Sequence, residues 1–238
     1  RRGVDDFADP CTEREARRPV AQLVGRREFW SFTLEVTGAT LVPRPETELL
    51  VERALARIPP EAAWTIADLG TGSGAIALAI ALERPACRVL ATDLSKPALA
   101  VARRNARTLG LRNITFRQGD WLAPLPQPDS PGWRFHMILS NPPYIATDEW
   151  SLTDPELGFE PRVALDGGRD GLTAYRVITA GAPRHLRPGG WLLLEHGFRQ
   201  AEDVRGLLRK AGFGSVATTT DLAGRPRVSE GQIGVTPE

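Results

Sequence analysis

The sequence of 238 residues has few of the side chains that build metal centres and disulfides. It contains only two cysteines, Cys11 and Cys87, and three scattered histidines. Because none of these residues forms the closely spaced pairs that bind zinc, we expect no metal ion. Two cysteines without a disulfide framework are typical of a reducing compartment, so we expect a cytoplasmic protein.

Long apolar runs and an excess of charge are also missing. No apolar run reaches the ~18 residues of a membrane span, and no secretory signal is present, so we expect no membrane association. The chain has 30 basic and 29 acidic residues, with lysine only at Lys96 and Lys210. Binders of nucleic acid usually carry a concentrated basic face, so we expect no direct nucleic-acid partner. For one domain of this size we expect a monomer.

The order of apolar segments is the main evidence for the fold. From residue 64 onward, short apolar segments alternate with helical ones, which predicts a parallel sheet with helices on both faces. The last two strands have no helix between them, which predicts an antiparallel edge. We expect strands at 64–69, 87–92, 114–118, 135–140, 191–195, 213–219 and 227–235, helices at 75–83, 95–109, 172–186 and 199–210, and a long loop at 145–170.

The segment before this alternation has a different pattern. Residues 1–27 resemble the end of a helical region but are too short and too charged to form a core. Residues 28–42 are rich in strand formers, and Thr37 and Gly38 are a turn signal, so we expect a β-hairpin that turns at these two residues. Pro45 then suits the first turn of a helix.

A glycine-rich segment, Asp-Leu-Gly-Thr-Gly-Ser-Gly at 68–74, follows the first expected strand. An open parallel sheet binds nucleotide-like ligands at this place, because glycines let the backbone approach the ligand and the next helix offers free N–H groups. A tight structural turn or a nicotinamide site could look similar. However, the spacing differs from the dinucleotide fingerprint, and Asp68 would repel a pyrophosphate. Asp68 instead favours a ligand with a cationic amino-acid end.

Two further positions support a particular cofactor. Asp93 ends the second expected strand, where its carboxylate can accept both ribose hydroxyls. S-adenosylmethionine has a ribose, a sulfonium and an ammonium but no phosphate, so we expect this cofactor, with S-adenosylhomocysteine as product. After the third strand, Asp120 could accept from the adenine amino group and Trp121 could pack on its face; the alternative is a surface turn with a core tryptophan. The expected cofactor contacts are Asp68, Gly70, Thr71, Gly72, Ser73, Gly74, Asp93, Asp120, Trp121 and Asn141.

The sharpest signal is the string Asn141, Pro142, Pro143 and Tyr144 after the fourth expected strand. Two prolines stop the strand and stiffen the loop. The Pro142 carbonyl and the Asn141 side chain then offer two acceptors at fixed angles, which match the two hydrogens of a planar NH₂ group. Tyr144 can cover that group with its ring. Since the sulfonium is already a strong electrophile, positioning and electrostatics can supply most of the acceleration. The alternative is a rigid turn with an exposed tyrosine.

Together these strings resemble the protein-(glutamine-N5) methyltransferases that act on peptide-chain release factors, often called the HemK family. The resemblance extends from about residue 17 to the end of the chain. The string at 43–48, Pro-Arg-Pro-Glu-Thr-Glu, resembles the release-factor enzymes more than the ribosomal-protein glutamine methyltransferases. The other matching strings lie at 18–25, 68–74, 141–144, 160–161 and 164–168.

The resemblance implies a seven-stranded class I (Rossmann-like) methyltransferase fold and methylation of the glutamine side-chain N5 in the Gly-Gly-Gln motif of a release factor. It implies a remnant of an N-terminal helical domain at 1–27, a β-hairpin linker at 28–45 and the methyltransferase domain at 46–238. It also implies catalytic roles for Asn141, Pro142 and Tyr144, and substrate contacts from Asn141, Pro142, Pro143, Tyr144, Arg44 and Glu48.

Other functions compete with this one. The Asn-Pro-Pro-Tyr string also occurs in methyltransferases of DNA adenine and RNA guanine, so a nucleic-acid N-methyltransferase is an alternative, as is a ribosomal-protein glutamine methyltransferase. A scaffold that only binds the cofactor would not need the intact string, and a nicotinamide oxidoreductase fits the glycine spacing poorly. We interpret His136 and His196 as structural residues.

Overall fold

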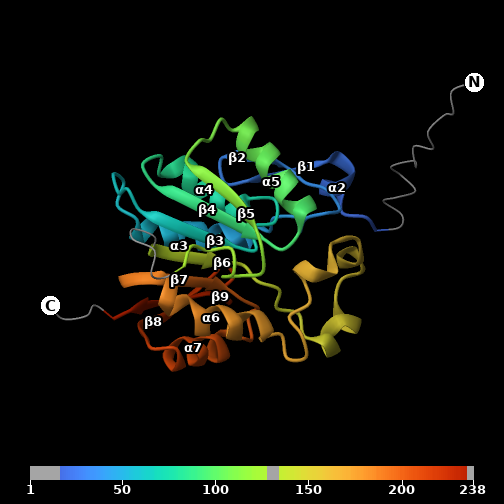
Figure 1. Ribbon diagram of the computed structural model, residues 1–238. Helices are drawn as coiled ribbons and strands as arrows, with labels where there is room; N and C mark the ends of the chain where they lie inside the picture. Colours follow the sequence, from blue (N-terminus) through green and yellow to red (C-terminus); the bar gives the residue numbers. More distant parts are fainter. Residues whose placement is uncertain (1–16, 128–133, 235–238) are drawn as a thin grey trace, which may run out of the picture.

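The computed structural model describes residues 17–127 and 134–234 and contains, within these residues, a seven-stranded sheet between two layers of helices (Figure 1). The strand order is β5-β4-β3-β6-β7-β9-β8. The first five strands in this order are parallel, and β9 is antiparallel to both of its neighbours. The sequence-based prediction of a mostly parallel sheet with an antiparallel edge is therefore confirmed.

Most element bounds lie within a few residues of those expected. The helix at Ala75–Glu83 and the strands at Ile114–Gln118 and Phe135–Ser140 coincide with the prediction. The strands are β3 Thr65–Leu69, β4 Arg88–Asp93, β5 Ile114–Gln118, β6 Phe135–Ser140, β7 Leu186–Glu195, β8 Phe213–Thr220 and β9 Pro226–Ile233. The helices are α2 Val20–Val24, α3 Glu48–Arg57, α4 Ala75–Glu83, α5 Lys96–Thr108, α6 Thr173–His185 and α7 Ala201–Lys210.

Each face of the sheet has its own core. One core joins α3 and α4 to side chains such as Ile66 and Met137, and the other joins α6 and α7 to side chains such as Leu69 and Ile138. Because both faces are covered, the central strands β3 and β6 are buried along nearly their whole length rather than at alternate residues. Helix α4 is buried on nearly all sides, and its alternating small side chains allow this close packing.

The β-hairpin is present, but its turn is not where the sequence suggested. Strands β1 (Arg26–Phe29) and β2 (Phe32–Glu35) pair with Phe29 opposite Phe32, so the chain turns at residues 30–31. The prediction of a turn between strands at Thr37 and Gly38 is wrong: these residues begin a separate turn, closed by a bond from the Thr40 N–H to the Thr37 carbonyl. Trp30 adopts the unusual positive φ of 56° that the tight turn needs.

Tertiary contacts select this turn. The Trp30 backbone N–H donates to Glu48 Oε1 at 2.7 Å, and its indole N–H donates to Glu83 at 2.8 Å. The alternating side chains Phe29 and Leu34 are fully buried in the core below the hairpin. A signal based on turn-forming residues alone could not detect these bonds, because both acceptors lie on helices later in the chain.

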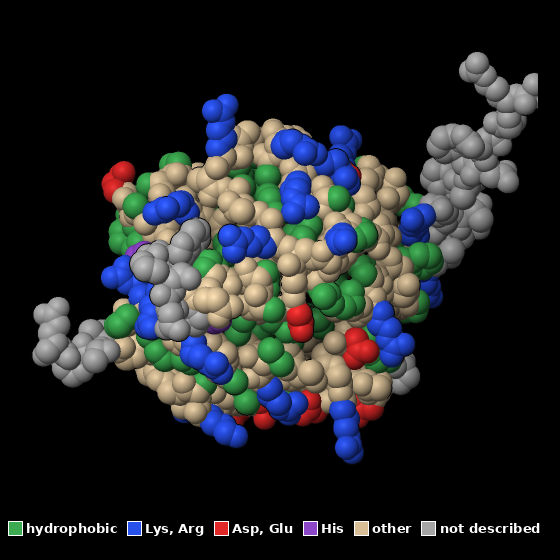
Figure 2. Space-filling view, in the orientation of Figure 1, with side chains coloured by type: hydrophobic (Ala, Val, Ile, Leu, Met, Phe, Trp, Pro, Cys, Tyr) green, Lys and Arg blue, Asp and Glu red, His purple; other side chains and the backbone are tan. Residues whose placement is uncertain are grey.

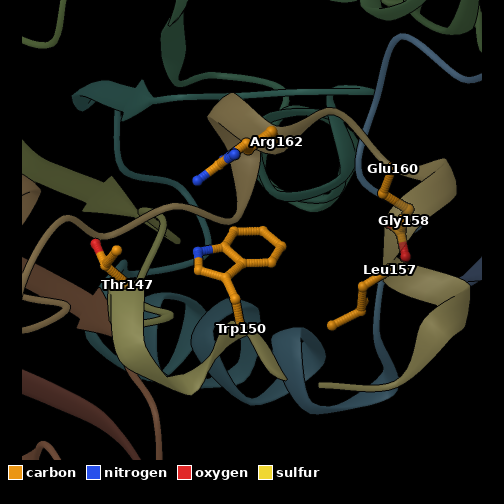
Figure 3. A pocket seen from close by; sticks show the side chains of 6 residues that line it. All are labelled: Thr147, Trp150, Leu157, Gly158, Glu160 and Arg162. Carbon is orange, nitrogen blue, oxygen red and sulfur yellow. The ribbon is translucent and has the colours of Figure 1, made fainter. Parts of the chain in front are cut away.

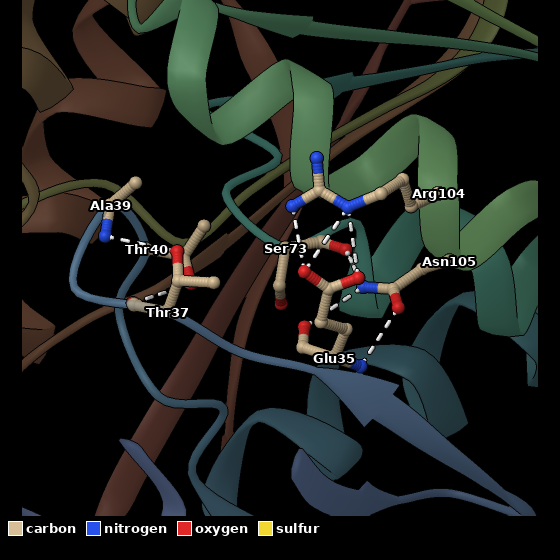
Figure 4. Close-up of polar contacts among 7 residues, drawn as sticks. All are labelled: Glu35, Thr37, Ala39, Thr40, Ser73, Arg104 and Asn105. Atoms are coloured by element: carbon tan, nitrogen blue, oxygen red, sulfur yellow. Dashed lines mark hydrogen bonds and ion pairs between the residues drawn. The ribbon is translucent and has the colours of Figure 1, made fainter. Parts of the chain in front are cut away.

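The hairpin is attached to helix α5 through one buried amide (Figure 4). Asn105 Oδ1 accepts from the Glu35 N–H at 2.8 Å, and Asn105 Nδ2 donates to the carbonyl oxygens of Glu35 and Ser73 at 3.0 and 2.9 Å. Arg104 adds a bidentate ion pair with the Glu35 side chain. Asn105 therefore ties the hairpin to the glycine-rich segment and fixes residues 37–41 beside it.

Candidate active site

A cavity of about 330 Å³ opens at the carboxyl ends of the parallel strands. The ends of β3, β4, β5 and β6 meet here, which is where open α/β sheets bind ligands. The cavity brings together several residues that the sequence singled out: Gly70, Gly72, Asp93, Asp120, Trp121, Asn141 and Pro143. It also brings in residues without an expected role, which are Ala39, Thr40, Leu41, Leu94, Ser95, Ala98, Gly119, Pro161, Val163, Ala164, Asp166, Gly168, Thr173 and Ala174.

The glycine-rich segment exposes its backbone to this cavity. Gly70 and Gly72 have positive φ angles of 71° and 56°, which side chains rarely adopt. A Cβ added to Gly70 would lie 3.3 Å from the Trp121 ring, so the indole covers the loop closely. The Thr71 N–H donates to the Thr92 carbonyl at 2.9 Å and holds the loop against the neighbouring strand. The geometry therefore suits a flat ligand lying on the loop beside Trp121.

Asp93 is held in a fixed orientation at the end of β4. Its two carboxylate oxygens accept the backbone N–H groups of Gly72 and Ser95 at 2.9 and 2.8 Å. Burial raises the pKa of Asp93, and the same N–H groups oppose this shift. Since a carboxylate has about four acceptor positions, each oxygen can still accept a ligand hydroxyl.

Asp68 lies beneath the loop and is fully buried. Its Oδ2 accepts the Thr71 hydroxyl at 2.6 Å. Burial raises the pKa of Asp68 to about 7, against the opposing effects of the Thr71 hydroxyl and the Ala77 N–H. Asp68, Thr71, Ser73 and Gly74 do not line the cavity, and their roles in binding the cofactor stay predictions.

The Asn-Pro-Pro-Tyr string begins one residue after β6, which the Ser140 hydroxyl ties to the Leu69 carbonyl at 2.7 Å. Asn141 Nδ2 donates to Thr47 Oγ1 at 3.2 Å, and Asn141 itself lines the cavity. The Asn141 amide is thus held through its nitrogen, and its oxygen stays available as an acceptor. Pro142 is buried and Pro143 lines the cavity.

Tyr144 packs against the core beneath α6 and α7. Its backbone carbonyl accepts from the Gln200 side chain at 3.0 Å. Burial raises the pKa of the Tyr144 phenol to about 12, so the hydroxyl stays protonated at neutral pH. This tyrosine is therefore anchored at both its backbone and its ring.

Arg44 and Glu48, both expected substrate contacts, each bond to another residue of the protein. Arg44 pairs with the buried Glu160, which also accepts the Val42 N–H at 2.8 Å. Glu48 accepts the Trp30 N–H, as described above. Neither residue lines the cavity, and their roles in substrate binding stay predictions.

Two functional candidates near Asn141 were missed by the sequence analysis. Thr47 belongs to the Pro-Arg-Pro-Glu-Thr-Glu string but was given no role, and its side chain is buried against Asn141. Glu195, at the end of β7, is 2% exposed; burial raises the pKa of its carboxyl, and Thr47 and Asn141 oppose that shift. The sequence signal that could have found Glu195 is its position. It is the last residue of a buried parallel strand, so it lies at the same edge of the sheet as Asn141.

Beside the cavity, the expected long loop at 145–170 folds into short 3-10 helices. These are η2 Thr147–Leu152, η3 Pro155–Phe159 and η4 Arg162–Ala164. They enclose a second hollow of about 300 Å³, lined by Thr147, Trp150, Leu157, Gly158, Glu160 and Arg162 (Figure 3). The Arg162 guanidinium lies 5.2 Å from the centre of the Trp150 ring, which orders this side of the hollow.

The histidines interpreted as structural lie outside the cavity. His136 Nδ1 accepts the Thr65 N–H at 3.0 Å, and its ring stacks on Trp64. His196 is fully buried and bonds Ser229 at 2.8 Å. The structural interpretation of both histidines is confirmed. In the part of the chain that the structure describes, no group of three metal-binding side chains occurs, and no helix is long and apolar enough to cross a membrane.

Comparison with known proteins places this site in a family. Residues 60–209 match a family model described as a methyltransferase domain. The chain is 54% identical to a release factor glutamine methyltransferase of Xylella fastidiosa over 96% of this chain and 82% of that protein. It is 47% identical to the protein of the same name from Salmonella typhimurium, over 95% of this chain and 80% of that protein.

A solved structure agrees with these relatives. The protein-(glutamine-N5) methyltransferase (release factor-specific) from Alicyclobacillus acidocaldarius is 32% identical, with a TM-score of 0.52 over 84% of this chain and 99% of that one. Identity at these levels over most of both chains shows common descent as well as a common fold. The chain therefore belongs to the family of release factor glutamine methyltransferases.

Proposed function

We propose that this protein transfers a methyl group from S-adenosylmethionine to the side-chain N5 of the glutamine in the Gly-Gly-Gln motif of a peptide-chain release factor. The observation that carries the proposal is the Asn141 amide, held from behind by Thr47 and facing the cavity above the glycine-rich segment. The substrate class comes from the relatives of this chain that are named release factor glutamine methyltransferase.

The residues around the cavity fit the proposed cofactor. Asp93 can accept the two ribose hydroxyls, because its backbone partners leave acceptor positions free. Trp121 can stack on the adenine, with Asp120 beside it. Asp68 provides negative charge under the loop for the cationic amino-acid end. When bound, S-adenosylmethionine supplies a methyl group on a positively charged sulfur.

The chemistry required of the protein is orientation. An amide nitrogen is a poor nucleophile, because its lone pair is delocalised into the carbonyl. Acceptors for both N–H bonds, the Asn141 side chain and the Pro142 carbonyl, increase the electron density on nitrogen and aim it at the methyl group. The sulfur–methyl bond would break as the N–C bond forms; the nitrogen would become cationic and then lose one proton to water, so no strong base is needed beforehand.

A methyl-transfer assay tests this function. Purified protein is incubated with radiolabelled S-adenosylmethionine and with a release factor, its Gly-Gly-Gln variant carrying Gln→Ala, or total RNA and DNA. We expect label in the release factor and none in the Gln→Ala variant. Label confined to nucleic acid would refute the proposal and support the base-methylating alternative.

The surface favours the protein substrate over nucleic acid. Arginine and lysine side chains are spread over the face shown in Figure 2, with hydrophobic side chains exposed between them, rather than gathered into one basic patch. A base-methylating enzyme needs a continuous basic surface to grip the backbone while the base is extruded. We therefore propose that this chain binds no nucleic acid directly.

The pH dependence of cofactor binding is a first prediction. Asp68 has a pKa raised to about 7, so its charge is present above pH 7 and is lost as the pH falls through 7. Because the cationic cofactor favours the ionised form, binding is coupled to release of a proton. We expect the affinity for S-adenosylmethionine, measured by calorimetry, to fall as the pH is lowered from 7.5 to 5.5, with a limiting slope of about tenfold per pH unit.

The matched variant is Asp68→Asn, which keeps the shape of the side chain and its oxygen for the Thr71 hydroxyl. It is expected to bind weakly and to show a shallower dependence on pH, since the neutral amide at position 68 does not titrate. An unchanged slope in Asp68→Asn would show that Asp68 is not the titrating group.

A further inference from the structure

Glu195 is a buried carboxyl that the proposed chemistry leaves without a role. It ends β7, next to β6, and in the parallel register Leu194 lies opposite Ser140, so Glu195 lies beside Asn141. Its residue is 2% exposed, and its Oε2 is buried without a hydrogen-bond partner among the described residues. Burying a carboxyl whose acceptor positions are not all filled lowers the stability of the fold, so we infer that the Glu195 carboxyl has a specific role.

The donors around Glu195 are side chains that hold Asn141. The Thr47 hydroxyl and the Asn141 amide both oppose the rise that burial causes in the pKa of the carboxyl, so they are the donors available to its ionised form. Thr47, which is 4% exposed, also accepts from Asn141 Nδ2 at 3.2 Å. A hydroxyl has one proton: when Glu195 accepts it, Thr47 can only accept from Asn141. Both contacts then select the NH₂ end of the amide.

We propose that Glu195 is a positioning residue, whose carboxylate, with the Thr47 hydroxyl, locks the Asn141 amide with its nitrogen turned inward and its oxygen facing the substrate. The inference rests on the proposed function, because it concerns the acceptor for the glutamine NH₂ group. Without this lock, the nearly symmetric amide can rotate and present NH₂ to the substrate's NH₂. Two donors then face each other, and the nucleophile is neither held nor activated.

The charge state of Glu195 decides whether the lock is set. Burial raises the pKa of Glu195 to about 7, opposed by Thr47, Arg227 and Asn141 and reinforced by Glu46. The neighbouring Tyr175 hydroxyl donates to the backbone carbonyl of Glu195 at 2.8 Å, so it leaves the carboxyl free. Above pH 7 the carboxylate accepts from Thr47 and Asn141. Below pH 7, a protonated Glu195 can donate to the Thr47 hydroxyl. The hydroxyl proton is then free to bond the oxygen of the Asn141 amide, which would turn the NH₂ group toward the substrate.

The test compares Thr47→Val, Thr47→Ser, Glu195→Gln and the double variant Thr47→Val/Glu195→Gln. Thr47→Val removes the hydroxyl at constant shape and is expected to lower kcat at saturating cofactor by about 10- to 100-fold. Thr47→Ser keeps the hydroxyl and should retain kcat within a few-fold. Glu195→Gln should lower kcat, and in the Thr47→Val background it should add little, because both residues act through Asn141.

A pH profile separates positioning from a structural role. Wild-type kcat at saturating cofactor should fall as the pH drops through about 7, whereas Glu195→Gln should lose this acid limb. Thermal melts and cofactor titrations show whether each variant is folded. A folded Thr47→Val with wild-type kcat, or Glu195→Gln with an unchanged acid limb, would overturn the inference. An inactive wild type would instead refute the proposed function, which keeps the two failures distinct.

Discussion

Replacing Asn141 with alanine is expected to lower kcat for methyl transfer by roughly 10²- to 10³-fold, the usual loss when one oriented transition-state contact is removed. In the proposed function, the Asn141 side chain holds the substrate nitrogen through its oxygen, and alanine has no acceptor to replace it. The fold should survive, because Asn141 lies after the last residue of β6 and its side-chain nitrogen donates to Thr47 rather than to a backbone group of the sheet. Single-turnover kinetics with preloaded cofactor measures the effect on the chemical step.

A matched control comes from Asn113, an asparagine that directly precedes β5. Asn113 donates to the carbonyl oxygens of Ala81 and Cys87 at 2.9 and 3.2 Å and is remote from the cavity. Asn113→Ala should lower the free energy of unfolding by about 1–3 kcal/mol without changing kcat. If Asn141→Ala lowers stability but leaves kcat at the wild-type level, Asn141 is not the amide acceptor.

Replacing Asp93 with alanine is expected to weaken the binding of S-adenosylmethionine by roughly 100-fold, or about 2.7 kcal/mol. Two effects combine. The variant loses the acceptors for the ribose hydroxyls, and it frees the Gly72 N–H that Asp93 fixes at 2.9 Å, so the loop itself loosens. Calorimetric titration gives the dissociation constant directly.

The control for this variant is Asp203→Ala, in the exposed first turn of α7. It removes the same charge but should leave the affinity for the cofactor unchanged, because screening weakens distant surface charges. Equal losses in Asp93→Ala and Asp203→Ala would indicate a general electrostatic effect and argue against a ribose contact.

Local patterns were sufficient to predict the sheet. Helix Ala75–Glu83 and strand Phe135–Ser140 have the predicted bounds. Each is a mainly apolar segment next to glycine or proline residues, which restrict where the helix or strand can begin and end. The same reasoning located the cavity, since Gly70, Asp93 and Asn141 each follow a parallel strand. Carboxyl ends of parallel strands necessarily meet at one edge.

Features that depend on distant contacts could not be predicted in this way. The hairpin turns at residues 30–31 because Glu48 and Glu83 receive the N–H groups of Trp30, and no local turn signal reports such bonds. Thr47 and Glu195 lie 148 residues apart in the sequence and come near each other because α3, which directly follows η1 (Pro45–Thr47), packs against β7. Part of the expected helical remnant, at 1–16, lies outside the described residues.

The bond pattern of Asn105 has a consequence for how the protein opens. One amide satisfies both backbone groups of Glu35 and the carbonyl of Ser73; the two Glu35 groups would be left unpaired if the hairpin moved away from α5, and the Ser73 carbonyl if the glycine-rich segment did. At about 1–3 kcal/mol for each buried unpaired group, such a separation is rare. The hairpin and the glycine-rich segment should therefore behave as one unit in hydrogen exchange, with the Glu35 amide exchanging as slowly as those of α5. We then expect cofactor and substrate to enter beside η4, whose residues Val163 and Ala164 line the cavity.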